Sequence, residues 1–401
     1  MLVFISHRYF WPDRAPEAAI LRWVASHLVK HGYSVDVVSS QPSYHGSSDL
    51  GRRPTKEVVD GIRVTRLRLP PESGGKFWRI SNAIYLGLYT IFKTFLTSYN
   101  VIIVSTVPPV FGAFCSAISA RLTNADLIYY CMDLHPEIGL LSGDFKNPIL
   151  YRLLAWMDDW SCRQASAVLV HSEDMINTLR QRKRGNEYKI RIMNNFSPPT
   201  DVNVETLMDF EDDVRRNRLN LIYAGNIGRF QGLETLIEAM GMIVERSDIE
   251  LVVLGEGVIK NKLVQMVKSL NANVRFIDHQ PRFVANQLIQ RADLGLVMLS
   301  PEIYKYAYPS KTMAYLEQGV PIIALVESDS ELVKVMLADG YGFNVQSRNA
   351  ADLSALLLKL AEDCSWKNPM KIAAIAAFNK RFSANVVLEK WLKIVRLGRL
   401  S

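Results

Sequence analysis

The chain has 401 residues, a net charge of +7, and a composition that is 49% hydrophobic and 22% charged. This length exceeds one ordinary hydrophobic core and predicts two domains of about 200 residues each. The composition excludes a disordered, fibrous or multi-span membrane protein. Residues 1–200 hold 23 basic and 16 acidic side chains, so the first half carries the whole positive excess. We therefore expect an anionic partner on that half.

The cysteines and the opening residues indicate the compartment. The four cysteines stand far apart, without a CxxC pair, so neither a zinc site nor a disulfide framework is expected and no metal is predicted. The opening MLVFISH predicts a strand rather than a signal peptide. The longest apolar stretch, residues 80–92, contains Asn82 and is shorter than the roughly 20 residues that a membrane span needs. We expect a cytoplasmic protein.

Residues 51–93 carry the densest positive charge, with nine basic side chains against three acidic ones. They include the aromatic, helix-compatible stretch FWRISNAIYLGLYTIF. This pattern is typical of a helix that lies on an anionic membrane, and it predicts a peripheral membrane contact. A core-facing helix beside a solvated basic strand is the alternative. Nucleic acid is not expected as a partner, because no reading module accompanies the basic residues.

Strand and helix patterns alternate along the first half of the chain. Strands are predicted at 2–6, 34–40, 100–106, 126–133 and 167–172, with a helix at 18–31. Buried runs separated by helices indicate a parallel, doubly wound sheet. Periodicity is lost after Phe196, where Pro198 and Pro199 introduce an acidic stretch. This stretch predicts an interdomain linker.

A second alternating set follows the linker. The predicted strands and helices are 219–225, 233–245, 249–257, 258–270, 273–278, 283–291, 294–300, 311–318, 321–326 and 330–339. We therefore predict an α/β protein with an N-terminal domain at 1–196, a linker at 197–217 and a C-terminal domain at 218–380. A helix within 381–401 is expected to cross back to the first domain. Ligands are expected in a cleft between the carboxyl ends of the two sheets.

Two motifs in the second half suit a diphosphate. The glycine-rich turn GNIGRFQG places Gly225, Gly228 and Arg229 between a strand and a helix, where backbone N–H groups and a guanidinium can meet phosphate. In YPSKTM, Ser310 is a candidate N-cap and Lys311 stands in the first turn of a helix. A cation there opposes the helix dipole, and a bound anion would relieve that conflict. A plain tight turn and a solvated lysine are the alternatives.

Polar residues also follow a buried strand of the first half. Asp133, His135 and Glu137 lie within five residues at the mouth of the expected cleft, where they could bind sugar hydroxyls or act as acid and base. Loop capping by Asp133 is the alternative. Weaker candidates for holding the nucleoside follow strands of the second half: Glu256, His279 and Gln280.

The ordered series HRYFWPDRAPEAA, STVPPVFGAF, DLHPE, YAGNIGRFQGLETLIEA, LVVLGEG and PSKTMAYLEQGVPIIA resembles glycosyltransferase family four, of the GT-B fold. It is most similar to the bacterial group that builds exopolysaccharide, capsule and O-antigen. The resemblance implies two Rossmann-like domains, an acceptor domain first and a nucleotide-sugar domain second. It also implies a UDP-sugar donor, a lipid-linked or glycan acceptor, retention of configuration, and no metal or other cofactor.

Carried over by position, Arg229 matches the donor-phosphate arginine of the family and Lys311 a second cation. The family's pair of glutamates is replaced by Tyr306 and Ala314, so Glu256 or the backbone after Pro309 is expected to hold the ribose. Where the family has two glycines after the first strand, this chain has Arg14 to Glu17, and both of these side chains are assigned to the acceptor.

Two other functions remain open at this point. A sugar-nucleotide epimerase or hydrolase of the same fold would need no acceptor, and the basic segment 51–93 argues against it. A nucleotide-sugar-binding protein without catalysis would explain the missing glutamates. The retained Arg229 and Lys311, together with Asp133, argue for an enzyme that stabilises the leaving diphosphate.

Overall fold

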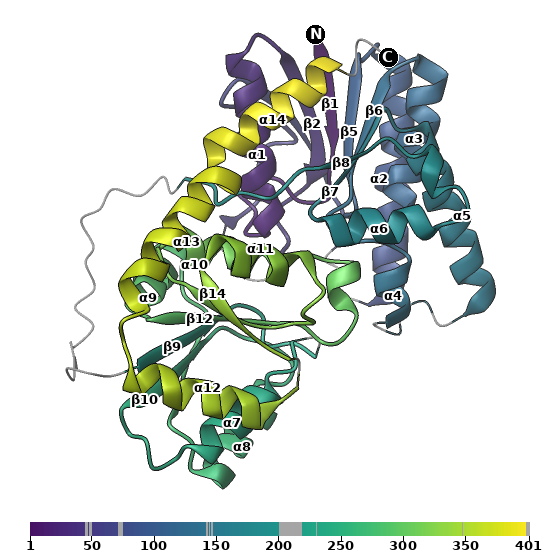
Figure 1. The fold of residues 1–401 in the computed structure, drawn as a ribbon. Coiled ribbons are helices and arrows are strands. Elements are labelled where there is room, and N and C mark those ends of the chain that lie inside the picture. Colours follow the sequence, from purple (N-terminus) through teal and green to yellow (C-terminus); the bar gives the residue numbers. More distant parts are fainter. Residues whose placement is uncertain are drawn as a thin grey trace. The chain divides into compact units, whose positions relative to one another are not determined.

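A computed structural model describes residues 1–44, 47, 50–70, 75–141, 143, 145, 147–199, 219–229, 231–346 and 348–397. The chain forms two compact units (Figure 1). The first unit comprises Met1–Pro198, Tyr306–Tyr308 and Ala384–Ser401, and the second comprises Pro199–Lys305 and Pro309–Ser383. The predicted linker at 197–217 lies almost entirely outside the described residues, as do the last four residues of the predicted tail.

The first unit is built on an eight-stranded sheet with the order β3-β4-β2-β1-β5-β6-β7-β8. Its strands are β1 (Leu2–Ser6), β2 (Ser34–Ser40), β3 (Lys56–Val59), β4 (Ile62–Leu67), β5 (Val101–Ser105), β6 (Asp126–Tyr130), β7 (Ala167–Val170) and β8 (Ile190–Ile192). Every pairing is parallel except that of the edge strand β3 with β4. The order reverses between β1 and β5, which makes this sheet doubly wound.

Helices cover both faces of this sheet. They are α1 (Pro16–Lys30), α2 (Lys76–Leu96), α3 (Phe111–Thr123), α4 (Glu137–Leu141), α5 (Pro148–Gln164), α6 (Glu173–Gln181) and α14 (Ala384–Leu397), with a 3₁₀ turn at Gly185–Glu187. Because side chains alternate along a strand, Ile103 faces α1 and α14 while Ile102 faces α2, α3 and α5. Within the described ranges, no helix has both the length and the apolarity that crossing a bilayer requires.

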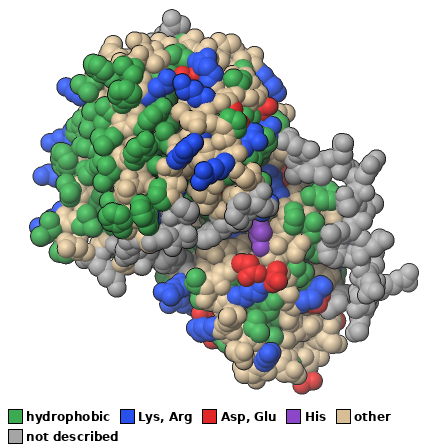
Figure 2. All heavy atoms as spheres, turned by 180° about the vertical axis from the view of Figure 1, so that it is seen from behind, with side chains coloured by type: hydrophobic (Ala, Val, Ile, Leu, Met, Phe, Trp, Pro, Cys, Tyr) green, Lys and Arg blue, Asp and Glu red, His purple; other side chains and the backbone are tan. Residues whose placement is uncertain are grey.

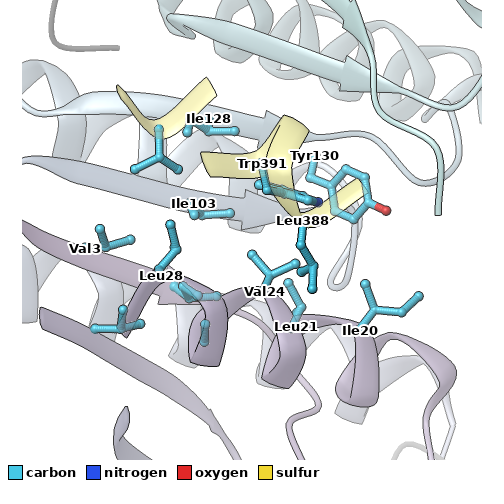
Figure 3. Close-up of a cluster of buried hydrophobic side chains, with 14 of the residues drawn as sticks. Val3, Ile20, Leu21, Val24, Leu28, Ile103, Ile128, Tyr130, Leu388 and Trp391 are labelled. Carbon is cyan, nitrogen blue, oxygen red and sulfur yellow. The ribbon is translucent and has the colours of Figure 1, made fainter. Parts of the chain in front are cut away.

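The C-terminal helix α14 completes the core of the first unit. Trp391 is 1% exposed and packs edge-on against Tyr130, with ring centroids 5.1 Å apart. Figure 3 shows Trp391 and Leu388 of α14 beside Ile128 of the sheet and Val24 of α1. Residues from the two ends of the chain therefore share one hydrophobic cluster.

The second unit contains a six-stranded parallel sheet with the order β11-β10-β9-β12-β13-β14. Its strands are β9 (Leu219–Ala224), β10 (Ile249–Leu254), β11 (Val274–Ile277), β12 (Leu294–Met298), β13 (Ile322–Leu325) and β14 (Gly342–Val345). Its helices are α7 (Glu234–Met242), α8 (Lys260–Leu270), α9 (Arg282–Gln290), α10 (Lys311–Glu317), α11 (Glu331–Asp339), α12 (Ala350–Glu362) and α13 (Lys367–Arg381), with a 3₁₀ turn at Ile303–Lys305. The order reverses between β9 and β12.

The two parallel α/β sheets confirm the predicted fold class. The main deviation in the predicted strands lies at 126–133, where the strand ends at Tyr130. Beyond it, Asp133 forms an isolated antiparallel bridge with Ala307, and the Leu134 N–H donates to the Tyr306 carbonyl oxygen at 2.8 Å. After the strand ends, the backbone of residues 133–134 therefore pairs with residues 306–307, which are distant in sequence, instead of with a neighbouring strand.

Candidate functional site

The predicted donor residues of the second unit all follow the carboxyl ends of neighbouring strands. Gly225, Gly228 and Arg229 follow β9, Glu256 follows β10, and Lys311 begins the helix after β12. Because β9 and β12 are adjacent and the strand order reverses between them, their carboxyl ends form the switch point at which open α/β sheets bind ligands.

Lys311 lies directly against the start of the glycine-rich turn. A Cβ atom added to Gly225 would stand 3.2 Å from Lys311 Cε and 3.5 Å from Lys311 Nζ. Lys311 Nζ donates a hydrogen bond to the Tyr223 hydroxyl at 3.0 Å and lies 4.4 Å from the centroid of the Tyr223 ring. Gly225 also has φ of +140°, so a side chain here would be strained as well as crowded.

The charge of Lys311 is poorly compensated. Burial lowers the pKa of its ammonium to about 8. Within the described part of the chain, Lys311 has no carboxylate within ion-pair distance, and its polar contact is the neutral Tyr223 hydroxyl. A partly buried cation without a counter-ion is costly, and an anionic ligand would remove that cost. The site is therefore suited to a phosphate.

Beside Lys311, the glycine-containing loops that follow β9 and β10 contact each other. The Ile227 N–H donates to the Glu256 carbonyl oxygen at 2.8 Å, and a Cβ on Gly257 would lie 2.2 Å from the Ile227 carbonyl oxygen. A Cβ on Gly255 would similarly lie 2.1 Å from the Gly225 carbonyl oxygen. Only glycine fits at these two positions, and Arg229 stands exposed at the far end of the same turn.

The other predicted donor residues have less direct support. The Glu256 carboxylate pairs with Lys260 Nζ at 2.7 Å, and His279 is exposed. The Gln280 side-chain amide donates to the Asp278 carbonyl oxygen at 3.3 Å. The expectation that Ser310 caps its helix is wrong, because its backbone is already helical and its side chain makes no capping hydrogen bond.

In the first unit, two predicted site residues, Asp133 and Glu17, interact electrostatically. Asp133 follows β6 and Glu17 follows β1, in the first turn of α1. Burial and then the nearby charge of Glu17 raise the pKa of Asp133 to about 6, and burial raises the pKa of Glu17 itself. Each carboxyl can therefore exchange a proton closer to neutral pH than a solvated one. Arg14 is exposed, and its backbone N–H donates to Ser47 Oγ at 3.1 Å.

Glu137, which was expected to contact the sugar, forms an ion pair within the first unit. Both of its carboxylate oxygens accept from Arg182, at 2.9 and 2.8 Å. Arg182 also donates to Asp158 at 2.6 Å and to the His135 carbonyl oxygen at 2.8 Å. The structure thus uses Glu137 to fix the loop that carries Asp133 and His135.

Two residues of this arrangement were not predicted from the sequence. Tyr223 lies beneath Lys311, and its position as the penultimate residue of β9 was the available signal. Arg182 follows α6, 45 residues after Glu137, and no local pattern indicates their pairing.

One described group of side chains could hold a metal ion: His27, His31 and Glu389 have ligand atoms within 4.8 Å of one another. None of these three is a predicted site residue.

Two family descriptions match consecutive parts of the chain. Residues 18–195 match "Glycosyl transferase 4-like domain" and residues 207–376 match "Glycosyl transferases group 1". Among curated proteins, WbjE of Pseudomonas aeruginosa, named as a glycosyltransferase, is 22% identical over 66% of this chain and 66% of its own length. WcaI of Escherichia coli, named for colanic acid biosynthesis, is 26% identical over 57% of this chain and 58% of its own length. Both matches thus span less than two thirds of the relative.

Solved structures share the fold over the whole chain. Sucrose-phosphate synthase of Thermosynechococcus elongatus has a TM-score of 0.72 at 14% identity, with coverage of 100% and 99% of the two chains. HepE of Anabaena, solved with UDP and glucose, has a TM-score of 0.67 at 14% identity, with coverage of 98% and 99%. The two doubly wound units define a GT-B fold. The chain belongs to the GT-B glycosyltransferases of the family-four type.

Proposed function

We propose that this protein is a retaining, metal-independent glycosyltransferase that moves a sugar from a UDP-sugar to a lipid-linked or glycan acceptor in polysaccharide biosynthesis. The observation that carries the proposal is Lys311, a desolvated cation held against Gly225 at the switch point of the second sheet, with no carboxylate partner among the described residues. The names of WcaI and WbjE and the UDP bound by HepE support the reaction class and the donor.

In this proposal the second unit binds the leaving group. Breaking the bond between the sugar and UDP develops negative charge on the β-phosphate, and Lys311, Arg229 and the N–H groups of the glycine turn stabilise it. These fixed charges take the part that a divalent cation takes elsewhere. Each well-placed donor contributes about 3 kcal/mol to the transition state.

The first unit orients the acceptor. Asp133 and Glu17 offer two carboxyls of raised pKa at the carboxyl edge of the first sheet. Such groups accept a hydrogen bond from a sugar hydroxyl when ionised and donate one when protonated. His135 lies in the same loop, whose position is held by Arg182. We assign Asp133 as the first candidate for contact with the reacting hydroxyl.

UDP binding to Lys311 variants tests the donor site. Lys311→Met should raise the melting temperature of the free protein, because it removes a desolvated charge, and should abolish the stabilisation by UDP, because it removes the phosphate contact. Arg229→Ala should leave the free protein unchanged and weaken UDP binding about tenfold or more. Differential scanning fluorimetry with a UDP titration measures both effects.

The matched control is Lys334→Met, which removes an exposed lysine of α11 and should behave as wild type. A full UDP response in Lys311→Met would disprove the donor assignment. For the reaction itself, UDP-sugar consumption is followed by NMR with candidate acceptors. An α-linked product from an α-linked donor indicates retention, whereas a new epimer of the donor without acceptor would indicate an epimerase.

A further inference from the structure

The outer surface of α2 to α5 carries most of the exposed apolar bulk of the described chain. Of the 24 large hydrophobic side chains that are exposed there, nine lie on α2, one on α3, two on α4 and four on α5. Figure 2 shows hydrophobic side chains gathered on one face, with basic side chains among them. Monomeric soluble proteins rarely expose so large a contiguous apolar patch without an interaction partner.

Helix α2 has the reverse of the usual amphipathic pattern. The side facing the sheet includes the buried polar residues Asn82, Thr90 and Thr94. Asn82 donates to the Pro70 carbonyl oxygen at 2.9 Å, and the Thr90 hydroxyl lies 2.8 Å from that of Ser6. On the other side Leu88 and Phe92 are 57% and 61% exposed. A helix whose outer side faced only water would carry polar residues there.

The apolar surface continues from α2 onto α5, a helix outside the basic and aromatic segment 51–93. Helix α3 packs against both α2 and α5, so the three helices form one layer over the sheet. On α5, Ile149 and Leu153 are 76% and 51% exposed. A surface made of two separate helices fits a broad planar partner better than it fits a single peptide.

The charge on this layer has one sign. Helices α2 and α3 contain no Asp or Glu, and α5 contains only Asp158 and Asp159. Asp158 is buried and bonded to Arg182, and Asp159 pairs with Arg163 at 3.0 Å. Among the side chains of this layer whose burial the structure describes, the exposed charges are those of three basic residues: Arg79, Arg121 and Arg152.

We propose that the outer surface of α2, α3 and α5 docks onto an anionic lipid bilayer, with α2 lying in the plane of the interface. Lipid supplies both an apolar layer for Leu88, Phe92 and Ile149 and negative headgroups for the arginines. A second copy of this surface would bring cations against cations. The proposal rests on this surface alone and is independent of the proposed reaction.

Vesicle co-sedimentation tests the docking. The wild-type protein should bind phosphatidylcholine vesicles that contain about a third phosphatidylglycerol. The pairs Leu88→Gln/Phe92→Gln and Ile149→Gln/Leu153→Gln should each lower the partition coefficient at least about tenfold. Arg121→Gln/Arg152→Gln should weaken binding to the anionic vesicles by about tenfold or more, with no effect on phosphatidylcholine alone.

The control pair Leu337→Gln/Ile372→Gln replaces equally exposed apolar residues of the second unit and should bind as wild type. Circular dichroism and the UDP melting shift establish that each variant is folded, and they report on the donor site separately from the vesicle result. Absence of wild-type binding, or an equal loss in the control pair, would overturn the proposal. A dimer that Leu88→Gln/Phe92→Gln dissociates, without lipid binding, would assign the surface to a second copy instead.

Discussion

Two single residues of this protein are held in states that cost free energy of folding. Lys311 and Asp133 are both desolvated, and burial shifts each pKa toward neutrality, downward for the lysine and upward for the aspartate. Groups in this state destabilise the free protein, and functional sites are where such groups concentrate. The two residues stand in different units, one suited to an anion and the other to a hydroxyl.

Asp133→Asn should stabilise the ligand-free protein at pH 7.5 by about 1–3 kcal/mol. Asp133 has a folded-state pKa of about 6, above that of an unfolded aspartate, so its ionisation opposes folding once the pH exceeds the unfolded value. The gain should therefore be full above pH 6 and disappear below about pH 4. Urea unfolding at several pH values measures it, and a gain that is independent of pH would show that the charge is not its cause.

The place of a residue in the fold could be predicted where a fold rule fixed it. Gly225 and Lys311 lie at one sheet edge because the carboxyl ends of adjacent parallel strands meet there, and their role in donor binding stays a prediction. The pairing of Glu137 with Arg182 could not be predicted, because Arg182 lies far along the chain. A carboxylate in a polar loop looks the same in sequence whether it binds a ligand or an arginine.

At the scale of elements, Arg182 ties three pieces of the first unit together. It stands just after α6, pairs with Glu137 at the start of α4, and reaches Asp158 in α5, which is 2% exposed. Removing one member of a buried ion pair leaves the other charge without compensation, which usually costs more than the pair contributes.

Arg182→Gln should lower the free energy of unfolding by about 3 kcal/mol, because it leaves Asp158 buried without its cation. It should also speed amide hydrogen exchange at 134–141, the loop and helix that Glu137 anchors. Exchange mass spectrometry with urea unfolding measures both. As a comparison, Arg246→Gln removes a partly exposed pair with Asp248 and should change stability little. Similar effects in the two variants would contradict the anchoring role.

The elements that were predicted share one physical signal. Strands such as β5 and β12 are continuous apolar runs, because helices bury both of their faces. The edge strand β3 and its neighbour β4 lack such runs, and the structure places Arg66 in β4 fully buried, paired with Glu57 of β3 at 2.5 Å. Helix α2 was predicted as a helix, but the spacing of its apolar residues did not indicate which side faces the sheet.

At the scale of the whole molecule, each unit has its own hydrophobic core and its own candidate ligand. The core of the first unit requires Trp391 and Leu388 from α14, while that of the second is built from β9 to β14 and their helices. Perturbations of the two cores are therefore expected to act on separate unfolding transitions.

Trp391→Ala should lower a melting transition that UDP does not raise, by truncating a buried side chain at a cost of about 3–5 kcal/mol. The matched variant Leu251→Ala, in the core of the second unit, should lower the UDP-sensitive transition instead. Scanning calorimetry with and without UDP separates the two cases. If Trp391→Ala shifted the UDP-sensitive transition alone, the assignment of the two cores would be wrong.

The membership of α14 in the first unit has a consequence for biosynthesis. On the ribosome, residues 1–198 emerge before the second unit, yet the cluster around Tyr130 cannot close until α14 has been made. The second unit, whose residues emerge in between, can complete its sheet earlier. During translation the first unit must therefore keep an unfilled apolar face while nearly two hundred further residues are synthesised. We therefore expect chaperones to bind the first unit during this interval.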